Sequence, residues 1–270
     1  KDVVECGGGP ASNAAYLLAK WGIDTYFAGT VGNDDFGKRI KSEFKEVGVK
    51  TDYLELKKNG KTTLSFIVNN KQNGSRTIFT RMNDKEDLKV DITIKPDFIL
   101  VDGEDPKVAK KVIKNNPEAI SIIDAGRMKD EVVELAKLVD YVVCARVFAE
   151  EYTGVRVNVH DPDSMKQIFK KMNKDFKNVI ITLEDKGALY QKDNKIKLMP
   201  SIKVKAVDST GAGDIFHGAF VYGIINGFDI EKTIMMANIA GALSVTKIGG
   251  RYSIPSLKEV KETYLKCTTG

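Results

Sequence analysis

Short apolar runs alternate along most of the chain with amphipathic or charged segments, and this alternation constrains the fold more than any other feature. Ile120–Asp124 and Val179–Leu183 are nearly continuous apolar runs, which is typical of parallel strands covered on both faces. Further strands are expected at Tyr26–Val31, Phe98–Asp102 and Tyr141–Cys144. The pattern predicts repeated βαβ units, and hence an α/β fold with a three-layer α/β/α arrangement around a mostly parallel sheet.

The segment from about residue 56 to 82 breaks this rhythm. Two strand-like runs, Thr63–Val68 and Arg76–Thr80, flank Asn73-Gly74 with no helix between them, which predicts a β-hairpin. The hairpin is either a lid over a ligand site or a plain edge hairpin, and the pattern favours neither. We interpret residues 1–270 as one domain carrying this insertion. The first five residues resemble the end of a strand, so we expect an N-terminal strand to precede residue 1.

Composition excludes several classes of function. The excess of 42 Lys and Arg over 37 Asp and Glu is spread along the chain, so no nucleic-acid face is expected. Three cysteines without C-x-x-C spacing indicate reduced thiols, and two histidines leave little material for a zinc site or a Ser-His-Asp triad. The longest apolar run, Ile215–Ile225, is shorter than the ~20 residues of a membrane span. We therefore expect a cytoplasmic protein with neither nucleic-acid nor membrane partners.

The segment Asp208–Asp214 carries the strongest chemical signal. Val204–Val207 is expected to be a strand that leads into this loop, and a helix is expected to follow. Gly211, Ala212 and Gly213 would let the backbone approach a ligand, while the first N–H groups of the helix form an anion site. Asp214 in the first turn can accept a proton from a hydroxyl. On the pattern alone, however, a simple helix cap is the favoured role for Asp214.

A second glycine-rich loop, Gly7–Gly9, precedes a helix expected over Ala14–Trp21, and it too is expected to follow a strand. Asn13 near its end offers both a donor and an acceptor to sugar hydroxyls. The loop does not match the dinucleotide fingerprint G-x-G-x-x-G. Gly32–Arg39 fits G-x-x-x-x-G-K but has Arg39 where a P-loop needs Ser or Thr. We interpret this last segment as a turn and helix start, with Asp34 or Asp35 as the cap.

At these segments the chain resembles the ribokinase-like (pfkB) carbohydrate kinase family. The resemblance implies an α/β/α domain, a β-sheet lid that often forms a homodimer, and phosphorylation of a sugar hydroxyl by ATP with Mg²⁺. It also implies that Asp214 is the catalytic base. The segments that carry the resemblance run from end to end of the chain: Gly8-Gly9 through Asn13, Val31–Gly37, Asp102-Gly103, Asp124–Gly126, Thr182-Leu183 with Gly187, and Asp208–Asp214.

The resemblance also implies roles for individual positions. Sugar contacts fall on Gly8, Gly9 and Asn13, and contacts to the transferring phosphate fall on residues 211–213. Positions that line the ATP pocket in the family correspond to Thr182, Gly187 and Asn238. Many members hold a monovalent cation, usually K⁺, mostly through backbone carbonyls. The matching segments here contain Asp208, Thr210, Gly249 and Ser253.

The chain departs from the family pattern in three places. The Asn-x-x-Glu motif that helps organise Mg²⁺ corresponds to Ala145–Phe148, and Arg146 within it faces either a ligand or solvent. Pro10 stands where ribokinase itself has a basic residue beside the sugar glycines. The early strand with its sugar-binding Asp has no counterpart after Lys1. Two further side chains keep open roles: Arg251 as an anion contact or exposed loop residue, and His217 as a nucleotide neighbour or, preferably, a packed residue.

The sequence thus predicts an ATP-dependent sugar kinase with a ribose- or fructose-like substrate. A nucleoside kinase is the alternative within the same family, since the scaffold accepts ribosides. A non-catalytic sugar-binding or regulatory protein is the alternative from another class, suggested by the lost Asn-x-x-Glu. The intact glycine loop and Asp214 favour the enzyme.

Overall fold

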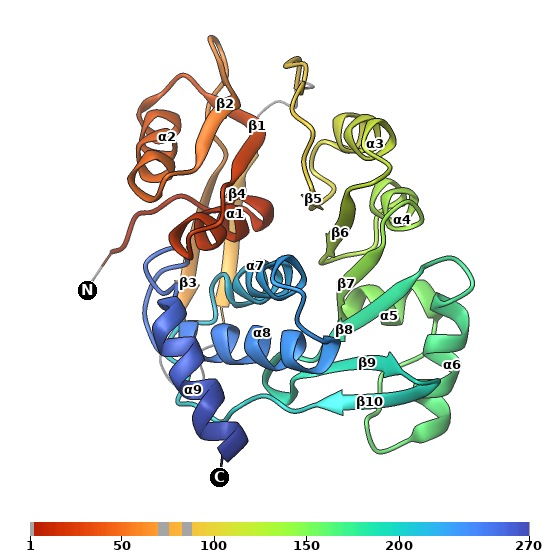
Figure 1. The fold of residues 1–270 in the computed structure, drawn as a ribbon. Coiled ribbons are helices and arrows are strands. Elements are labelled where there is room, and N and C mark those ends of the chain that lie inside the picture. Colours follow the sequence, from red (N-terminus) through yellow and green to blue (C-terminus); the bar gives the residue numbers. More distant parts are fainter. Residues whose placement is uncertain (1–2, 70–75, 83–87, 270) are drawn as a thin grey trace.

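The main sheet has six strands in the order β10-β9-β8-β7-β6-β5 (Figure 1). The computed structural model describes residues 3–69, 76–82 and 88–269. Strands β5 to β8 are parallel, whereas β9 and β10 are antiparallel to their neighbours. The strands are β5 (Phe98–Val101), β6 (Ile120–Ala125), β7 (Tyr141–Ala145), β8 (Asn178–Thr182), β9 (Ala188–Lys192) and β10 (Lys195–Met199). The mostly parallel sheet is confirmed, and four of the five predicted central strands lie in it.

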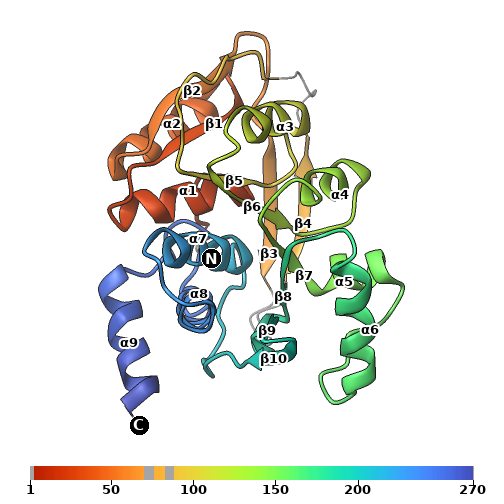
Figure 2. The same ribbon diagram turned by 45° about the vertical axis from the view of Figure 1, so that its right-hand side comes forward.

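Helices cover both faces of this sheet, so the three-layer prediction is also confirmed (Figure 2). Alternate strand residues face opposite cores, because successive side chains in a strand point to opposite sides. Ile123 and Val142 belong to one core, whereas Ile122 and Val143 belong to the other. The first core contains α3 (Pro106–Asn115), α4 (Asp130–Ala136), α5 (Arg146–Thr153) and α6 (Pro162–Met172). The second contains α1 (Pro10–Lys20), α7 (Ala212–Ile225), α8 (Ile230–Ser244) and α9 (Leu257–Thr269).

Helix α7 lies at the centre of its layer. Residues 215 to 223 are all buried, so this helix is enclosed on every side and has no exposed stripe in that stretch. Gly218 allows α1 to approach closely, because a Cβ at this position would lie 3.1 Å from the Cα of Ala14. This close approach fixes the N-terminal turns of α1 and α7 relative to each other.

A second, smaller sheet lies beside the first. Parallel strands β1 (Tyr26–Gly32) and β2 (Lys50–Lys57) pair with each other, and α2 (Asp35–Val47) packs on them around Phe44. No described strand of the main sheet pairs with them. Asp34 caps α2 by accepting the N–H of Gly37 at 2.9 Å, which confirms the prediction of a turn and helix start.

The predicted hairpin is confirmed as an antiparallel pair, β3 (Leu64–Asn69) and β4 (Arg76–Arg81). Its expected turn at Asn73-Gly74 lies outside the described residues. Among the described strands these two pair only with each other, so the hairpin is not an edge of the main sheet. Its base is anchored at Thr62, whose N–H and hydroxyl both donate to the Asp34 carboxylate, at 2.9 and 2.6 Å.

Two local predictions were wrong. Val204–Val207 is exposed and forms no strand, and residues 3–5, the described part of the expected N-terminal strand end, form none either. Apolar residues alone do not make a strand, because a strand needs a neighbouring backbone to pair with.

A short 3₁₀ turn, Glu184–Lys186, follows β8. No helix in the described part of the chain is long and apolar enough to cross a membrane.

The contact at Gly218 generates a stability prediction. Gly218→Leu should lower the free energy of unfolding by about 1–3 kcal/mol, because the added side chain must push α1 away from α7. Lys170→Leu adds a leucine to the exposed face of α6 and serves as the control. Urea unfolding followed by circular dichroism measures both. An unchanged midpoint for Gly218→Leu would show that the two helices are not tightly packed.

Candidate active site

Asp214 and Asn13 form the centre of the site, although they are 201 residues apart in sequence. Asp214 lies in the first turn of α7, and Asn13 lies in the first turns of α1. The Asn13 Nδ2 donates to Asp214 Oδ2 at 2.6 Å. Asn13 is buried, whereas Asp214 is half-buried by accessible surface although protein atoms surround its carboxylate closely. The structure thus brings together the two side chains that the sequence assigned to base and sugar contact.

The loop before α7 has the shape of an anion site. Gly211 occupies the N-cap position with φ +76°, a left-handed conformation that favours glycine. A Cβ on Gly213 would meet no atom within 4 Å, so open space adjoins the helix N-terminus there. The N–H groups of the first turn lack intrahelical acceptors, and Ala212 at its start has only a long 3.4 Å bond to Ser209. A negatively charged group is favoured at this position.

Among the glycines before α1, Gly8 also faces open space. Gly8 is exposed, and a Cβ at this position would meet no atom within 4 Å. Gly9 is the N-cap of α1, with φ +98°. The N-terminus of α1 is closed by Asp102, whose Oδ2 accepts the N–H of Ala11 at 3.1 Å. Asp102 follows directly after β5, so the main sheet fixes the start of α1.

Asp102 and Asp124 join Asp214 in an acidic cluster at the carboxyl ends of the strands. Burial raises the pKa of all three. Repulsion from Asp214 and Asp102 raises the pKa of Asp124 further, and repulsion from Asp102 does the same for Asp214. Desolvation is the largest cause for Asp124 and brings its pKa to about 7, although the nearby His217 opposes the shift. For Asp214, the hydrogen bond from Asn13 and the charges of His217 and Arg76 oppose it. Sequence reasoning placed Asp102 and Asp124 at strand ends but assigned them no role.

His217 is packed beneath the acidic cluster, as the sequence analysis preferred. Its Nδ1 lies 2.6 Å from the Gly213 carbonyl oxygen and 3.2 Å from Asp124 Oδ2. Its Nε2 lies 3.1 Å from the carbonyl oxygen of Val143. All of these partners are oxygen atoms, so both ring nitrogens of His217 face acceptors.

Arg76, on strand β4 of the hairpin, contacts the loop that precedes α7. Its Nη1 donates to the carbonyl oxygen of Ser209 at 2.6 Å and to the Ser209 hydroxyl at 2.8 Å. Asn69, directly opposite Arg76 in the strand pair, hydrogen-bonds the Asp208 carboxylate. Side chains at positions 67, 69, 76 and 78 share this face of the hairpin, because opposed residues and every second residue point the same way. The sequence analysis missed Arg76, since nothing local links it to residue 209.

The segments expected to hold a monovalent cation also meet. Asp208 is buried and accepts the N–H groups of Thr210 and Gly249, each at 2.9 Å. Burial raises its pKa, but these bonds outweigh burial and hold the pKa below the ordinary value. The Thr210 Oγ1 is buried beside the Asp208 carboxylate, whose pKa its hydroxyl helps to lower, and its oxygen keeps lone pairs that can coordinate an ion. Ser253 donates its hydroxyl to the Gly250 carbonyl, so its side chain is already used.

The residues expected near ATP lie around the end of β8. Thr182 donates its hydroxyl to the Cys144 carbonyl at 3.3 Å. Gly187 has φ +106°, and a Cβ there would overlap the Met199 carbonyl, so this position requires glycine. The Asn238 amide donates to Met199 and Pro200 carbonyls, at 3.0 and 3.4 Å. Asn238 therefore fixes the chain after β10 and uses its side-chain donor in doing so.

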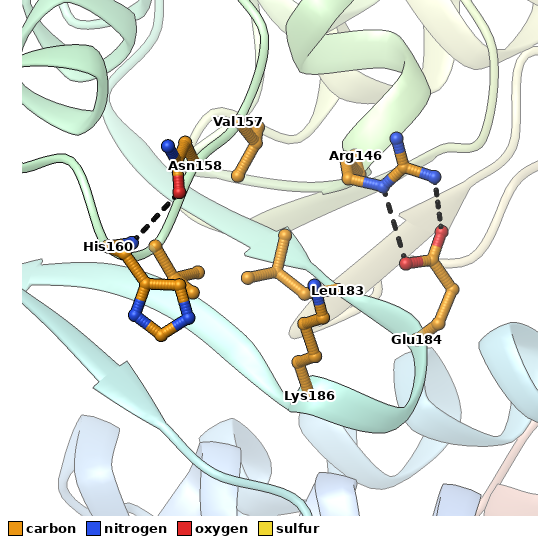
Figure 3. Close-up of a pocket in the computed structure, with 8 residues that line it drawn as sticks. Arg146, Val157, Asn158, His160, Leu183, Glu184 and Lys186 are labelled. Atoms are coloured by element: carbon orange, nitrogen blue, oxygen red, sulfur yellow. Dashed lines mark hydrogen bonds and ion pairs between the residues drawn. The ribbon is translucent and has the colours of Figure 1, made fainter.

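The segment Ala145–Phe148 carries neither the amide nor the carboxylate of the family's Asn-x-x-Glu motif. Ala145 ends β7, and Phe148 is fully buried in a hydrophobic core, so neither can organise a metal. Arg146 donates from Nε and Nη2 to the Glu184 carboxylate at 3.4 and 3.2 Å, as Figure 3 shows, and also contacts Glu150. Within the described residues, no group of three or more His, Cys, Asp or Glu side chains is arranged to hold a metal ion. The residues present therefore do not fit a protein-built Mg²⁺ site.

Arg251 fits neither role that the sequence left open. It is 2% exposed, so it is not a surface residue of the loop. Its guanidinium pairs with Glu43 at 2.7 Å, so it is not free to receive an anionic ligand. Residue type and loop position gave no sign of this burial, because the partner carboxylate comes from a distant helix.

Comparison with known proteins identifies the family. A model of the pfkB family carbohydrate kinases matches residues 1–257. The chain is 30% identical to the ribokinase of Staphylococcus aureus over 268 residues, which cover 95% of this chain and 87% of that protein. It is 26% identical to fructokinase-1 of Oryza sativa, with 95% and 88% covered.

The fold agrees with this assignment. The Arabidopsis thaliana ribokinase, solved in complex with ribose and ATP, superposes with a TM-score of 0.79 at 23% identity, covering 95% of this chain and 87% of that one. A match over nearly the whole chain, together with the shared architecture, leaves one conclusion. The chain belongs to the pfkB family of carbohydrate kinases.

Proposed function

We propose that this protein transfers the γ-phosphate of ATP to a hydroxyl of a ribose- or fructose-like sugar, with Asp214 as the base. The observation that carries the proposal is the position of the Asp214 carboxylate, which lies on the first turn of α7 and is held by Asn13 at 2.6 Å. A proton acceptor and an anion-binding helix end thus occur within one turn. The ribose and ATP bound to the Arabidopsis relative support the choice of substrates.

Each residue of the site has a separate role in the proposed phosphoryl transfer. Asp214 accepts the proton of the attacking hydroxyl, and its raised pKa makes it a stronger base than an ordinary carboxylate. The N–H groups of Gly211, Ala212 and Gly213 stabilise the negative oxygens of the transferring phosphoryl group, since positioning and charge stabilisation dominate this reaction. Asn13 orients Asp214 and, with Gly8 and Gly9, borders the space for the sugar.

Nucleotide and metal ions complete the proposal. ATP would lie near Thr182, Gly187 and the start of α7, where the family places its nucleotide. Mg²⁺ is expected to accompany ATP, because this ion keeps several waters and binds substrate phosphates rather than all-protein cages. No step is assigned to it, since Ala145 and Phe148 replace the family's motif.

A catalytic prediction follows from the role of Asp214. Asp214→Asn should remain folded and lose about 10²–10⁴-fold in kcat, because an amide cannot accept the proton. A coupled ADP-release assay over ribose, fructose, other sugars and nucleosides measures this. In the wild type, kcat/KM should fall as the pH drops through the raised pKa of Asp214, because the protonated carboxyl is no base.

The same assay separates the alternatives. Turnover with nucleosides in preference to sugars would favour a nucleoside kinase. Binding of sugar or ATP without turnover of any acceptor would contradict the kinase and favour a non-catalytic sugar-binding protein. Asp193→Asn, in the exposed β9–β10 turn, is the matched control and should keep wild-type activity.

K⁺ is the monovalent cation that we propose for the loop of Asp208, Thr210, Gly249 and Ser253. Most ligands would be backbone carbonyls, with the buried Thr210 hydroxyl oxygen as a further ligand. Asp208 would act by holding both loop segments through their N–H groups.

Activity should therefore rise on adding K⁺, and Asp208→Asn should raise the K⁺ concentration for half-activation by about 10–100-fold. Titration of KCl at constant ionic strength, balanced with choline chloride, measures this. Equal activity in the two salts would remove the cation site from the proposal.

A homodimer through the hairpin is proposed from its outward face. Phe66, Val68 and Phe79 share that face, opposite to the one that carries Arg76, and each is at least 60% exposed. A two-stranded hairpin is rarely stable alone, and a cluster of exposed aromatic residues favours burial against another surface. A second copy of the same hairpin would supply a matching apolar face.

Size-exclusion chromatography with light scattering should show two chains of 29.8 kDa each. The double variant Phe66→Ser/Phe79→Ser should be monomeric, because the apolar face is removed. Leu265→Ser on α9, also exposed, should leave the mass unchanged. A wild-type protein that is monomeric at all concentrations tested would contradict the dimer.

A further inference from the structure

The buried Arg251 lies at the junction of three segments that are distant in sequence. It belongs to the loop between α8 and α9, next to Gly249 and Gly250 of the proposed cation loop. Its Nη1 donates to Glu43 Oε2 on α2 at 2.7 Å, and its Nη2 donates to the Ser12 hydroxyl. The guanidinium also lies over the rings of Phe44 and Tyr16, at 4.6 and 5.3 Å from their centroids. All of these partners hold the arginine in one orientation.

Arg251 also contacts Asn13 of α1 directly. Its Nε donates to the Asn13 Oδ1 at 3.4 Å, while the same amide donates from Nδ2 to Asp214. The amide of Asn13 thus has its oxygen directed to a cation and its nitrogen directed to a carboxylate. Rotation of the amide by half a turn would place an oxygen against Asp214 and an NH₂ group against Arg251. Arg251 therefore selects the amide orientation that makes the bond to Asp214.

Glu43 extends the connection to the glycine loop. Its Oε2 accepts the backbone N–H of Gly7 at 2.8 Å as well as the Arg251 donor. Gly7 is buried, and a Cβ at this position would overlap the guanidinium of Arg251 and the carboxylate of Glu43. The start of the glycine loop therefore packs directly against the Arg251–Glu43 ion pair.

We propose that Arg251, together with Glu43, is a positioning residue that holds residues 7–13 against α7 and so sets the geometry between Asn13 and Asp214. The kinetic consequences of this inference rest on the proposed function. The contacts of Arg251 and Glu43 with residues 7–13, in contrast, are present in the unliganded protein. A buried ion pair is weak evidence for a gain in stability, because desolvation offsets the attraction between the charges. The Arg251–Glu43 pair instead fixes the orientation of the Asn13 amide. Apolar packing would not distinguish between the two orientations of this amide.

The design of the test separates positioning from folding. Arg251→Met alone removes the nearer of the two cations that pair with the buried Glu43 carboxylate and leaves Arg39, whose Nε lies 3.3 Å from Glu43 Oε1. The single variant is therefore expected to lose stability because a buried charge loses its closest partner. The double variant Glu43→Gln/Arg251→Met removes both charges and keeps an acceptor for the Gly7 N–H. Its thermal unfolding temperature should therefore remain close to that of the wild type. Lys247→Met, which removes a surface cation paired with Glu259, is the control for loss of one basic residue in this region.

Two measurements are made on each variant. With whichever of D-ribose or D-fructose the wild type phosphorylates, the double variant should lose about 10–100-fold in kcat/KM for the sugar. Its KM for ATP should change little, because the residues assigned to the nucleotide lie on other elements. Hydrogen–deuterium exchange of the unliganded protein should show faster exchange at residues 7–13 and unchanged exchange in α7. Arg251→Lys keeps the charge but not the fork of donors, so its kcat/KM should fall between those of the wild type and the double variant.

Wild-type kinetics and exchange in a folded double variant would overturn the proposal. Equal loss of exchange protection throughout the chain would also overturn it, since that result assigns Arg251 to global stability. Failure of the wild type to phosphorylate either sugar would count against the proposed substrates. The exchange measurement would still test whether Arg251 and Glu43 hold residues 7–13 in place, because it needs no turnover.

Discussion

Helices α1 and α7 meet where Gly218 leaves no room for a side chain between them, and the arrangement of the site depends on this contact. The contact brings the first turn of α7 beside the early turns of α1, so that Asn13 reaches Asp214. It also places both helix N-termini toward the carboxyl ends of β5 and β6, where Asp102 and Asp124 lie. Open α/β sheets bind ligands at this edge because loops and helix N-termini converge there.

Charge is concentrated at this edge. Burial raises the pKa of Asp102, Asp124 and Asp214, and charge repulsion from Asp102 raises the pKa of the other two further. The guanidinium of Arg76 and the helix N-termini supply the opposing positive potential. A sugar hydroxyl and a phosphoryl group have different electrostatic needs, a base for the first and donors for the second. In the proposed reaction, Asp214 and the N–H donors of the same helix end would meet both needs within one turn.

The differences from the family pattern are as informative as the agreements. Phe148 and Ala145 have turned a metal-organising position into hydrophobic core and strand end, while Arg146 pairs with Glu184 and Glu150. Arg251 and Glu43 form a buried pair behind the glycine loop. Asp214 and residues 211–213 match the family pattern, whereas several groups around them differ from it.

The sequence by itself determined the βαβ order, the hairpin and the segment ending in Asp214, because periodicity, glycine placement and helix-start chemistry are local properties. It wrongly predicted strand at residues 3–5 and 204–207, since pairing depends on a neighbouring backbone. Only the tertiary structure decided that Asn13 orients Asp214, that Arg76 reaches Ser209 and that Arg251 is buried against Glu43. These contacts join residues from 133 to 208 positions apart. Their partners are chosen by how helices and sheets pack, which no local pattern records.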